Sequence, residues 1–506
     1  MSPPPPPVVP LPQTRPGTRS RAARTLLPLL LLLLVLRLVL AGTLPLMDTT
    51  EARYAEIARK MAEIGDWITP WHEPGVPFWA KPPLSFWLTA WSFKLFGVSE
   101  FSARLPHLLC SLAVAALTGD LARRVLGATA GRRALALLGG SLMFVVASGA
   151  VMTDEVLLLC ITAALHAFWC ALHAPGRAAT YGRWGFFVAL GLGLLAKGPL
   201  APVLVLIQVL PWAALSGRLR DAVARLPWLR GLALMLLLAA PWYLAAEART
   251  PGFLQYFIVG EHWHRFVTPG WGGDRYGRAH QMAVGTIWLF AGLACLPWPL
   301  LLPWARRRGT GSRSGPPAAR GWTAFVVLWS LAPLLFFTPA RNIIAPYVLP
   351  ALPGLALWGA TWLQRQPPAR ADALLAGGLG LMALVLAAAC LLPTARWTDA
   401  HSARQLIRAD QQARRADPMD ATAAAPLVFV GERPFSASFY SGGRAREMAS
   451  LDALAAVAAA PTRVALPADE VQALPAHGLR VVRDLGRHGR WALLLVQAGD
   501  RESMRP

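Results

Sequence analysis

Charged side chains are scarce in this sequence. Only 15% of its 506 residues are Asp, Glu, Lys or Arg, whereas soluble domains carry about 25%. Hydrophobic residues make up 55% of the chain, and the mean hydropathy is +0.43. Several apolar runs approach the ~20 residues needed to cross a bilayer. The composition therefore predicts a polytopic membrane protein and argues against a soluble enzyme.

Acidic residues are fewer than basic ones. The sequence has 27 Asp and Glu against 49 Lys and Arg, a net charge of +22. In a soluble protein this excess would suggest a nucleic-acid partner. Here the arginines are spread through short loops between apolar runs, and no aromatic residues are interleaved with them as in a nucleic-acid groove. Cytoplasmic loops of membrane proteins carry such an excess, so no nucleic-acid partner is expected.

Cysteine is also rare, and its spacing excludes the usual cysteine chemistry. None of the five has metal-ligand or CxxC spacing, and all fall inside apolar runs, where a thiol is a small buried apolar side chain. They are Cys110, Cys160, Cys170, Cys295 and Cys390.

The N-terminal region divides into a tail and a first span. Residues 1–25 are rich in Pro and Arg and are predicted to be a disordered cytoplasmic tail. The run from Leu26 to Ala41, interrupted by Arg37, is predicted to be an uncleaved span. A signal peptide is the alternative, but no convincing small-residue cleavage site follows the run.

Further apolar runs predict ten more spans, which makes 11, and two others could lie in interfacial segments. The ten are roughly 104–125, 134–150, 153–172, 184–198, 200–215, 229–246, 282–304, 322–338, 344–363 and 373–393. With this count, four Arg-rich loops share one side with the N-terminus, as the positive-inside rule requires. The loops 45–81, 247–281 and 339–344 then lie on the outer side with the C-terminus.

Two segments after the first span are predicted to lie on the membrane rather than cross it. Residues 51–64 place apolar side chains on one helical face and charges on the other. Residues 82–97 are aromatic and apolar but short.

From about Thr394 the composition changes to short β-type runs between Ala-rich helical segments. Residues 394–506 are therefore predicted to be a small soluble α/β domain, acting as a lid or assembly module.

Acids and cations from distant segments gather on the predicted outer side. They are Asp48, Glu51, Arg53, Lys81, Asp154, Glu155, Lys197, Glu261, His262, His264, Arg265, Arg341 and Tyr347. Lys and Arg neutralise phosphates, and a carboxylate can accept a proton from an attacking hydroxyl. Structural roles compete with this interpretation, because Asp154 could complement a helix dipole and Lys197 could extend to the interface.

The motifs in this outer region resemble a known family. DTTEARY at 48–54, GDW at 65–67, FWAKPPLSFWL at 78–88, AKGP at 196–199, EHWHRF at 261–266 and PYVLP at 346–350 resemble the aminoarabinose (lipid A) transferases and related polyprenyl-phosphate-dependent membrane glycosyltransferases. The resemblance runs in order through about residues 26–365.

This resemblance implies a fold, a reaction and roles for single residues. It implies an all-α polytopic GT-C fold of about 11–13 transmembrane helices over residues 26–393, with a periplasmic catalytic loop at 45–81, in the bacterial inner membrane. The reaction would transfer a sugar from undecaprenyl phosphate to an outer-face acceptor such as lipid A or another glycolipid. Asp48, Asp154 and Glu51 would be the catalytic carboxylates. The donor phosphate would be gripped by Lys81, Arg265, Tyr347 and Lys197.

The chain departs from the family pattern at two positions. Many members have Asp directly before the Glu of the first motif and Glu before the motif lysine, where this chain has Thr50 and Ala80. No metal ligand set is therefore assigned, no cofactor is required, and a divalent cation is left as an option. A polyprenyl-linked lipid transporter or flippase, a protein O-glycosyltransferase and a non-catalytic assembly protein are the alternative functions. No inverted repeat and no chain of acids through mid-membrane positions supports a conduit.

Overall fold

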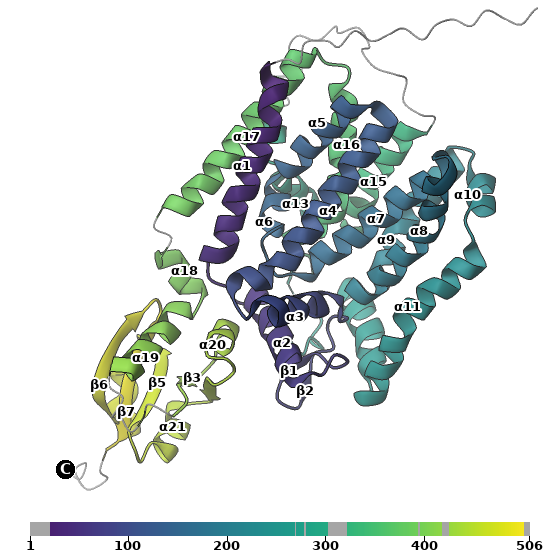
Figure 1. Ribbon diagram of the computed structural model, residues 1–506. Helices are drawn as coiled ribbons and strands as arrows, with labels where there is room; N and C mark the ends of the chain where they lie inside the picture. Colours follow the sequence, from purple (N-terminus) through teal and green to yellow (C-terminus); the bar gives the residue numbers. More distant parts are fainter. Residues whose placement is uncertain are drawn as a thin grey trace, which may run out of the picture.

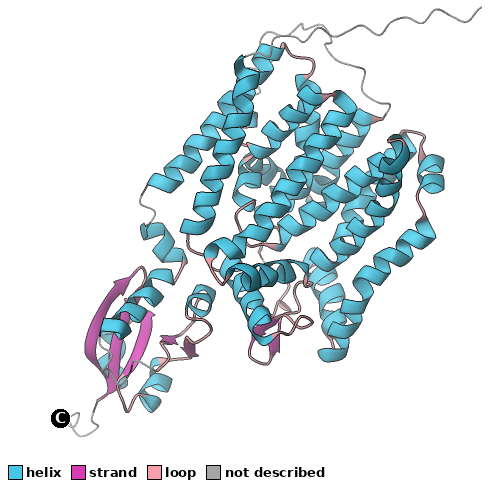
Figure 2. Ribbon diagram, in the orientation of Figure 1, coloured by secondary structure: helices cyan, strands magenta, loops and turns pink. Residues whose placement is uncertain are grey.

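A bundle of helices forms most of the computed structural model, and a small domain with a sheet is attached at one end (Figures 1 and 2). The structure describes residues 21–268, 270–277, 280–301, 321–392, 395–416, 422 and 425–499. Residues 1–20 of the predicted tail therefore lie outside the described residues. The first helix, α1 (Arg21–Thr43), begins five residues before Leu26, where the first span was predicted to start.

The bundle consists of apolar helices of very different lengths. After α1 its helices are α4 (Glu100–Leu126), α5 (Ala128–Gly139), α6 (Leu142–Ala147), α7 (Thr153–His173), α8 (Gly176–Lys197), α9 (Leu200–Leu215), α10 (Leu219–Arg225), α11 (Trp228–Arg249), α13 (Thr286–Ala294), α15 (Trp322–Phe337), α16 (Leu352–Leu363) and α17 (Pro368–Leu391). Among the described residues, five helices are long and apolar enough to cross a membrane: α1, α4, α7, α11 and α17.

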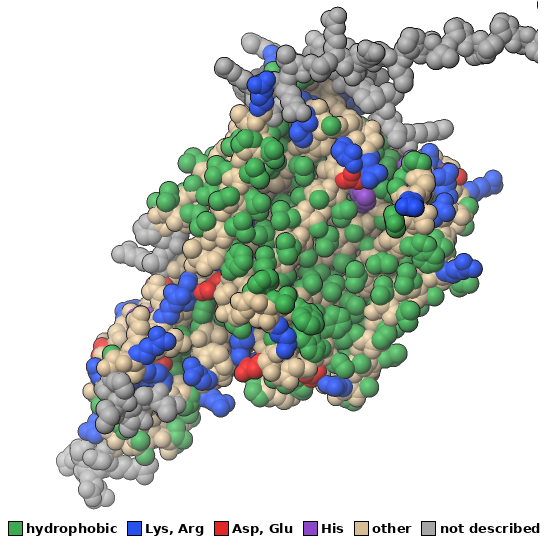
Figure 3. All heavy atoms as spheres, viewed as in Figure 1, with side chains coloured by type: hydrophobic (Ala, Val, Ile, Leu, Met, Phe, Trp, Pro, Cys, Tyr) green, Lys and Arg blue, Asp and Glu red, His purple; other side chains and the backbone are tan. Residues whose placement is uncertain are grey.

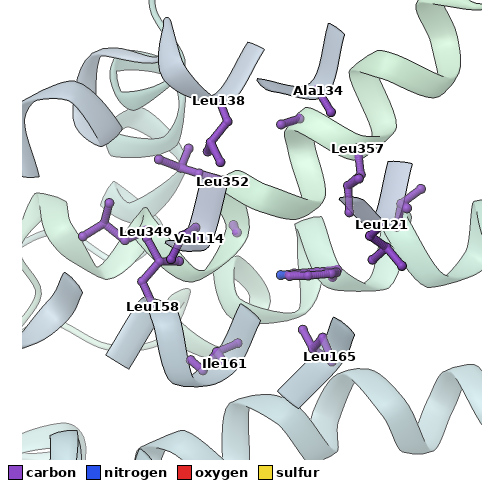
Figure 4. Packing of buried hydrophobic residues seen from close by; sticks show 14 of the residues in the cluster. Val114, Leu121, Ala134, Leu138, Leu158, Ile161, Leu165, Leu349, Leu352 and Leu357 are labelled. Carbon is purple, nitrogen blue, oxygen red and sulfur yellow. The ribbon is translucent and has the colours of Figure 1, made fainter. Parts of the chain in front are cut away.

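The bundle has one continuous apolar core and an apolar outer surface. Leucines from α4, α7 and α16 interlock at its centre, among them Leu121, Leu165 and Leu357 (Figure 4). Hydrophobic side chains also cover the outer face in Figure 3, while charged ones gather near its two ends and over the attached domain. A helix bundle that is apolar inside and outside suits a lipid environment, in which the backbone satisfies its own hydrogen bonds.

Glycine permits a close contact between α7 and α8. A Cβ on Gly182 of α8 would lie 2.6 Å from backbone atoms of Ala167 and Ala171 of α7. Without a side chain there, the two backbones approach closely, as small residues allow in membrane bundles.

Three predicted spans are interrupted among the residues that the structure describes, and one of them is 282–304, where α13 ends at Ala294 and a turn at 295–297 follows. The span at 134–150 is divided into α5 and α6 because Trp298 packs against Gly140 and donates from Nε1 to the carbonyl oxygen of Leu137 at 2.7 Å. The span at 344–363 starts as a 3-10 helix, η2 (Ala345–Ala351), before α16. Pro350 within η2 has no N–H to donate to a regular α-helical hydrogen bond.

The predicted surface helices lie at one end of the bundle, opposite α10 (Figure 1). They are α2 (Thr50–Ile64) and α3 (Leu84–Phe96), and a hairpin of β1 (Trp71–Glu73) and β2 (Val76–Pro77) lies between them. One face of α2 buries Tyr54, Ile57 and Met61. The apolar face of α2 therefore packs against protein, because α3 and the small domain cover it.

The small domain has a five-stranded mixed sheet in the order β4-β3-β5-β7-β6. The strands are β3 (Val428–Val430), β4 (Arg446–Met448), β5 (Thr462–Pro467), β6 (Leu479–His488) and β7 (Trp491–Ala498). Four of them coincide with the β-type runs of the sequence, which lie at 427–430, 463–466, 479–482 and 491–496; β4 was not predicted, since its REM sequence has no β-type pattern. Helices α19 (Arg404–Ala416) and α20 (Phe435–Tyr440) cover one face, and α21 (Leu451–Val457) and η3 (Val471–His477) cover the other. The predicted class, a helical membrane protein with a small C-terminal α/β domain, is confirmed.

One buried ion pair attaches α2 to the bundle. The Arg104 guanidinium, on α4, donates from Nε to Glu51 Oε1 at 2.8 Å and from Nη2 to Glu51 Oε2 at 2.7 Å. Its other donors reach the carbonyl oxygens of Ala41, Leu44 and Pro45 at 2.6 to 3.0 Å. Every N–H of this guanidinium is therefore bonded, and the pair joins the end of α1 to the start of α2.

Glu51→Gln is expected to destabilise the fold by about 3–5 kcal/mol, because it leaves the buried guanidinium without a counter-charge. Heat denaturation of the detergent-solubilised protein would measure the change. The control is Arg123→Ala, which removes a largely exposed partner of Asp120 and should cost less than about 1 kcal/mol. Equal stability of Glu51→Gln and the native protein would show that the pair does not hold α2 in place.

Candidate active site

The chain between α2 and α3 is shaped by a turn centred on Asp66. Gly65 ends α2 with φ +78°, and Asp66 Oδ1 then accepts from the backbone N–H groups of Ile68 and Thr69 at 3.0 and 3.1 Å. Asp66 Oδ2 accepts from Trp71 Nε1 at 3.0 Å. The GDW motif is thus a structural turn that directs the chain into the β1-β2 hairpin.

The segment that carries Lys81 is held by aromatic contacts. Phe78 is buried against Tyr276, with ring centroids 4.6 Å apart. The Tyr276 hydroxyl donates to the carbonyl oxygen of Pro77 at 2.7 Å and accepts from the Trp79 N–H at 3.0 Å. Trp79 Nε1 also donates to Thr250 Oγ1 at 3.0 Å. The backbone leading to Lys81 is therefore fixed on both sides before the prolines that start α3.

Lys81 lies at a cavity of about 320 Å³ between the loops at this end of the bundle. All four residues predicted to grip a donor phosphate line it: Lys81, Lys197, Arg265 and Tyr347. They come from four separate segments, namely the chain before α3, the end of α8, the start of α12 (Arg265–Val267) and η2. The chain has only four lysines, and two of them line this cavity.

Lys197 is fixed at the C-terminal end of α8. Its Nζ lies 2.6 Å from Asp154 Oδ1 and 4.8 Å from the centre of the Tyr347 ring. Gly198 follows with φ +69°, and a Cβ there would lie 2.7 Å from the Phe257 ring. Only glycine therefore lets the π-helix η1 (Gln255–His264) pack on this end of α8. That packing brings the segment carrying Arg265 beside Lys197.

Glu261, on η1, links the two remaining cations. Its Oε2 lies 3.2 Å from Lys81 Nζ and 2.9 Å from Arg265 Nη1. Its Oε1 accepts from the Tyr256 hydroxyl at 3.3 Å. Burial by itself would raise the pKa of Glu261, but Lys81 and Arg265 outweigh burial and hold the pKa below its usual range. The carboxylate is therefore ionised at neutral pH and bridges the two cations.

Asn342 also lines the cavity, although the sequence did not single it out. Its side chain is buried, and Oδ1 accepts from the backbone N–H of His280 at 3.0 Å. This contact sets the orientation of the amide. Within the described part of the chain, Nδ2 has no hydrogen-bond partner, and the same holds for Arg265 Nε. Two buried donors at one cavity are thus left for a ligand with acceptor oxygens.

The three predicted catalytic carboxylates lie in different surroundings. Asp154 opens α7 and reaches the cavity through Lys197. Both oxygens of Glu51 are bonded to Arg104. Asp48 lies in a second cavity of about 300 Å³ that it shares with the small domain. There it accepts from the backbone N–H of Ser436 at 2.8 Å and from the Ser436 hydroxyl. Burial raises the pKa of Asp48. The structure thus brings Asp154, but neither Asp48 nor Glu51, to the cations.

A metal site is not formed by the acids and histidines of the described residues. No group of three or more His, Cys, Asp or Glu side chains among them is arranged to hold a metal ion. Ala80, directly before Lys81, lines the cavity without offering a ligand. Both ring nitrogens of His262 lie within hydrogen-bond distance of backbone oxygens, those of Phe257 and Lys197.

The small domain contacts the segment that carries Lys81. Phe435 of α20 lies 5.5 Å from the His72 ring and 5.5 Å from the Arg53 guanidinium. Arg53 in turn donates to the carbonyl oxygen of Tyr276, whose hydroxyl positions Pro77 and Trp79. A continuous set of contacts therefore runs from the small domain to the base of Lys81. No local sequence pattern indicates these contacts, because they join positions more than 150 residues apart.

Comparisons with known proteins agree with the resemblance seen in the motifs. Residues 80–244 match the family described as dolichyl-phosphate-mannose-protein mannosyltransferase. Undecaprenyl phosphate-alpha-4-amino-4-deoxy-L-arabinose arabinosyl transferases from Pseudomonas paraeruginosa and Edwardsiella ictaluri are each 33% identical, over 68% and 69% of this chain. The chain spans 61% of the length of each of these relatives.

Solved structures show the same fold. The crystal structure of ArnT from Cupriavidus metallidurans bound to undecaprenyl phosphate superposes with a TM-score of 0.74, at 20% identity, over 94% of this chain and 98% of that one. The apo structure gives a TM-score of 0.70. The chain is therefore a multi-pass membrane protein that resembles the aminoarabinose transferases in sequence and has the GT-C fold of these polyprenyl-phosphate-dependent membrane glycosyltransferases.

Proposed function

We propose that this protein is an integral membrane glycosyltransferase that moves a sugar from an undecaprenyl-phosphate donor to an acceptor such as lipid A or another glycolipid. One observation carries the proposal: the four residues expected to bind the donor phosphate, from four distant segments, line a single cavity. The curated relatives named above are arabinosyl transferases of undecaprenyl phosphate-linked aminoarabinose, and ArnT binds undecaprenyl phosphate.

The cavity suits an amphiphilic donor. Its lining includes the cations Lys81, Lys197 and Arg265 and also apolar residues, among them Leu200, Val203 and Phe336. A phosphate would contact the cations, while the first isoprene units of a polyprenyl chain would contact the apolar residues. We place this cavity, the loop 45–81 and the domain 394–506 on the periplasmic side of the bacterial inner membrane. The arginine-bearing segments α10 and the α16–α17 connection lie at the opposite end, as the positive-inside rule requires (Figure 1).

The proposed reaction is a single inverting displacement. An acceptor oxygen attacks the anomeric carbon, the bond from that carbon to the donor phosphate oxygen breaks, and the polyprenyl phosphate leaves with the bonding electrons. Negative charge grows on the leaving phosphate, so Lys81 and Arg265 would stabilise the transition state. Asp154 would hold Lys197 beside Tyr347 for the same purpose. A hydroxyl acceptor also loses a proton, whereas a phosphate acceptor is already ionised near pH 7.

Lys81→Ala is expected to lower acceptor-dependent release of undecaprenyl phosphate by about 10²-fold or more, because it removes a cation aimed at the leaving group. The measurement uses the purified protein in proteoliposomes with a panel of labelled undecaprenyl-phosphate sugars, with and without total lipid extract or a protein acceptor. Lys94→Ala, at an exposed lysine of α3, is the matched control and should release phosphate at the native rate. Absence of release with every donor, together with flipping of labelled lipid, would favour the transporter instead.

Asp48→Asn is expected to slow the same reaction only a few-fold. The carboxylate contacts Ser436 of the small domain rather than the cavity cations, so its role would be to position the loop. Ser436→Ala removes part of the same contact from the other side and should have a similar effect. A loss of about 10²-fold or more in Asp48→Asn alone, with unchanged thermal stability, would assign Asp48 to general-base catalysis.

Asn342→Ala is expected to weaken binding of undecaprenyl phosphate by about tenfold, since a hydrogen bond to a charged group contributes about 1.5–3 kcal/mol. Titration of the detergent-solubilised protein with the lipid would measure the affinity. Gln364→Ala is the control, because this amide contacts the carbonyl oxygen of Leu126 at the other end of the bundle. Unchanged affinity in Asn342→Ala would exclude a ligand contact from this amide.

A further inference from the structure

Glu261 is the one acidic residue that lines the candidate donor cavity as the structure describes it, and the proposed mechanism gives it no role. Its side chain is 4% exposed. Its two oxygens contact a lysine, an arginine and a tyrosine hydroxyl. These are the donors that usually surround a bound phosphate. The Glu261 carboxylate therefore has the same kind of surroundings as a bound phosphate would have.

The charges around the cavity balance without a ligand. Lys197 is paired with Asp154, at 2.6 Å. Arg265 contacts Glu261 and also Asp274, whose Oδ2 lies 3.4 Å from Nη2. Lys81 contacts Glu261. Three cations therefore face three carboxylates, and an incoming phosphate adds negative charge to a balanced site.

The two lipid phosphates of the proposed reaction differ in charge. The donor is a phosphodiester with one negative charge. The product is a phosphomonoester whose second ionisation has a pKa of about 6, so it carries close to two charges at pH 7. Because Coulomb repulsion scales with the product of the charges, a fixed carboxylate beside the phosphate disfavours the product more than the donor.

We propose that Glu261 is a resident counter-ion that holds Lys81 and Arg265 in position in the empty cavity and weakens binding of the dianionic polyprenyl phosphate product. Without ligand, Glu261 keeps two adjacent cations from repelling each other. With the phosphate bound, Lys81 and Arg265 divide their contacts between the phosphate and Glu261. The product then leaves more readily than it would from a purely cationic site. This inference rests on the proposed function, since it takes the cavity as the phosphate site.

The test compares Glu261→Gln with the native protein. Affinity for undecaprenyl phosphate and for a polyprenyl phosphodiester is measured by titration in detergent at pH 8, where the monoester is dianionic. We expect Glu261→Gln to bind the monoester about tenfold more tightly and to gain less for the phosphodiester, because the removed charge repels a dianion about twice as strongly as a monoanion. Glu470→Gln, at an exposed acid of the small domain, controls for the change in net charge and should bind as the native protein does.

The outcomes separate this inference from the proposed function. Failure of the native protein to bind either lipid would overturn the proposed function. Native binding together with weaker or equal monoester binding in Glu261→Gln would overturn the counter-ion role alone and leave Glu261 as a positioning residue.

A second measurement needs no variant. The native protein is expected to gain little affinity for the monoester between pH 6 and pH 8, whereas a site without a repelling carboxylate gains affinity strongly as the monoester becomes dianionic. A strong rise in native affinity with pH would contradict the counter-ion role even if Glu261→Gln failed to fold.

Discussion

The buried contact between Arg104 and Glu51 determines where the loop after the first helix can lie. A guanidinium in a membrane bundle is costly unless each of its N–H groups is bonded and its charge is paired. Here Glu51 supplies the charge, and three carbonyl oxygens at the end of α1 accept the remaining donors. The start of α2 is therefore fixed against α1 and α4. From this point α2 carries the chain to the Asp66 turn, and the hairpin that follows delivers Lys81 to the cavity.

The small domain contributes to the same arrangement. Ser436 binds Asp48 directly before α2, Arg433 lies 2.6 Å from Glu73 in the hairpin, and Arg404 lies 2.9 Å from Glu100 at the start of α4. Each contact pairs a group of the small domain with a group of the predicted catalytic loop or its support. The domain thus packs directly on the loop, and apolar clusters cover both faces of its sheet.

The cavity shows how an apolar bundle can hold several charges. Each cation at its wall has a carboxylate partner, so no buried charge is left uncompensated. Among the cavity-lining residues that the structure describes, Asn342 Nδ2 and Arg265 Nε are buried donors without a hydrogen-bond partner. Such an arrangement is stable when empty and still offers contacts to an anionic ligand. Two of these cations are lysines, although the chain has only four lysines. The compact charge of a lysine suits a confined site.

The membrane class, most helix positions, the two surface helices, the C-terminal sheet, and the three cations and Tyr347 of the cavity followed from the sequence. The length of apolar runs, helical periodicity and the spacing of motifs such as FWAKPP are local features. Local features can be recognised in the sequence without knowledge of the fold. Tertiary structure alone decided the rest. It paired Glu51 with Arg104, placed Asp48 against Ser436, and brought Glu261 and Asn342 to the cavity. Whether a carboxylate forms a structural ion pair, acts as a counter-ion or acts as a base depends on which group lies within about 3 Å of it. That neighbour is determined by packing between segments far apart in the chain.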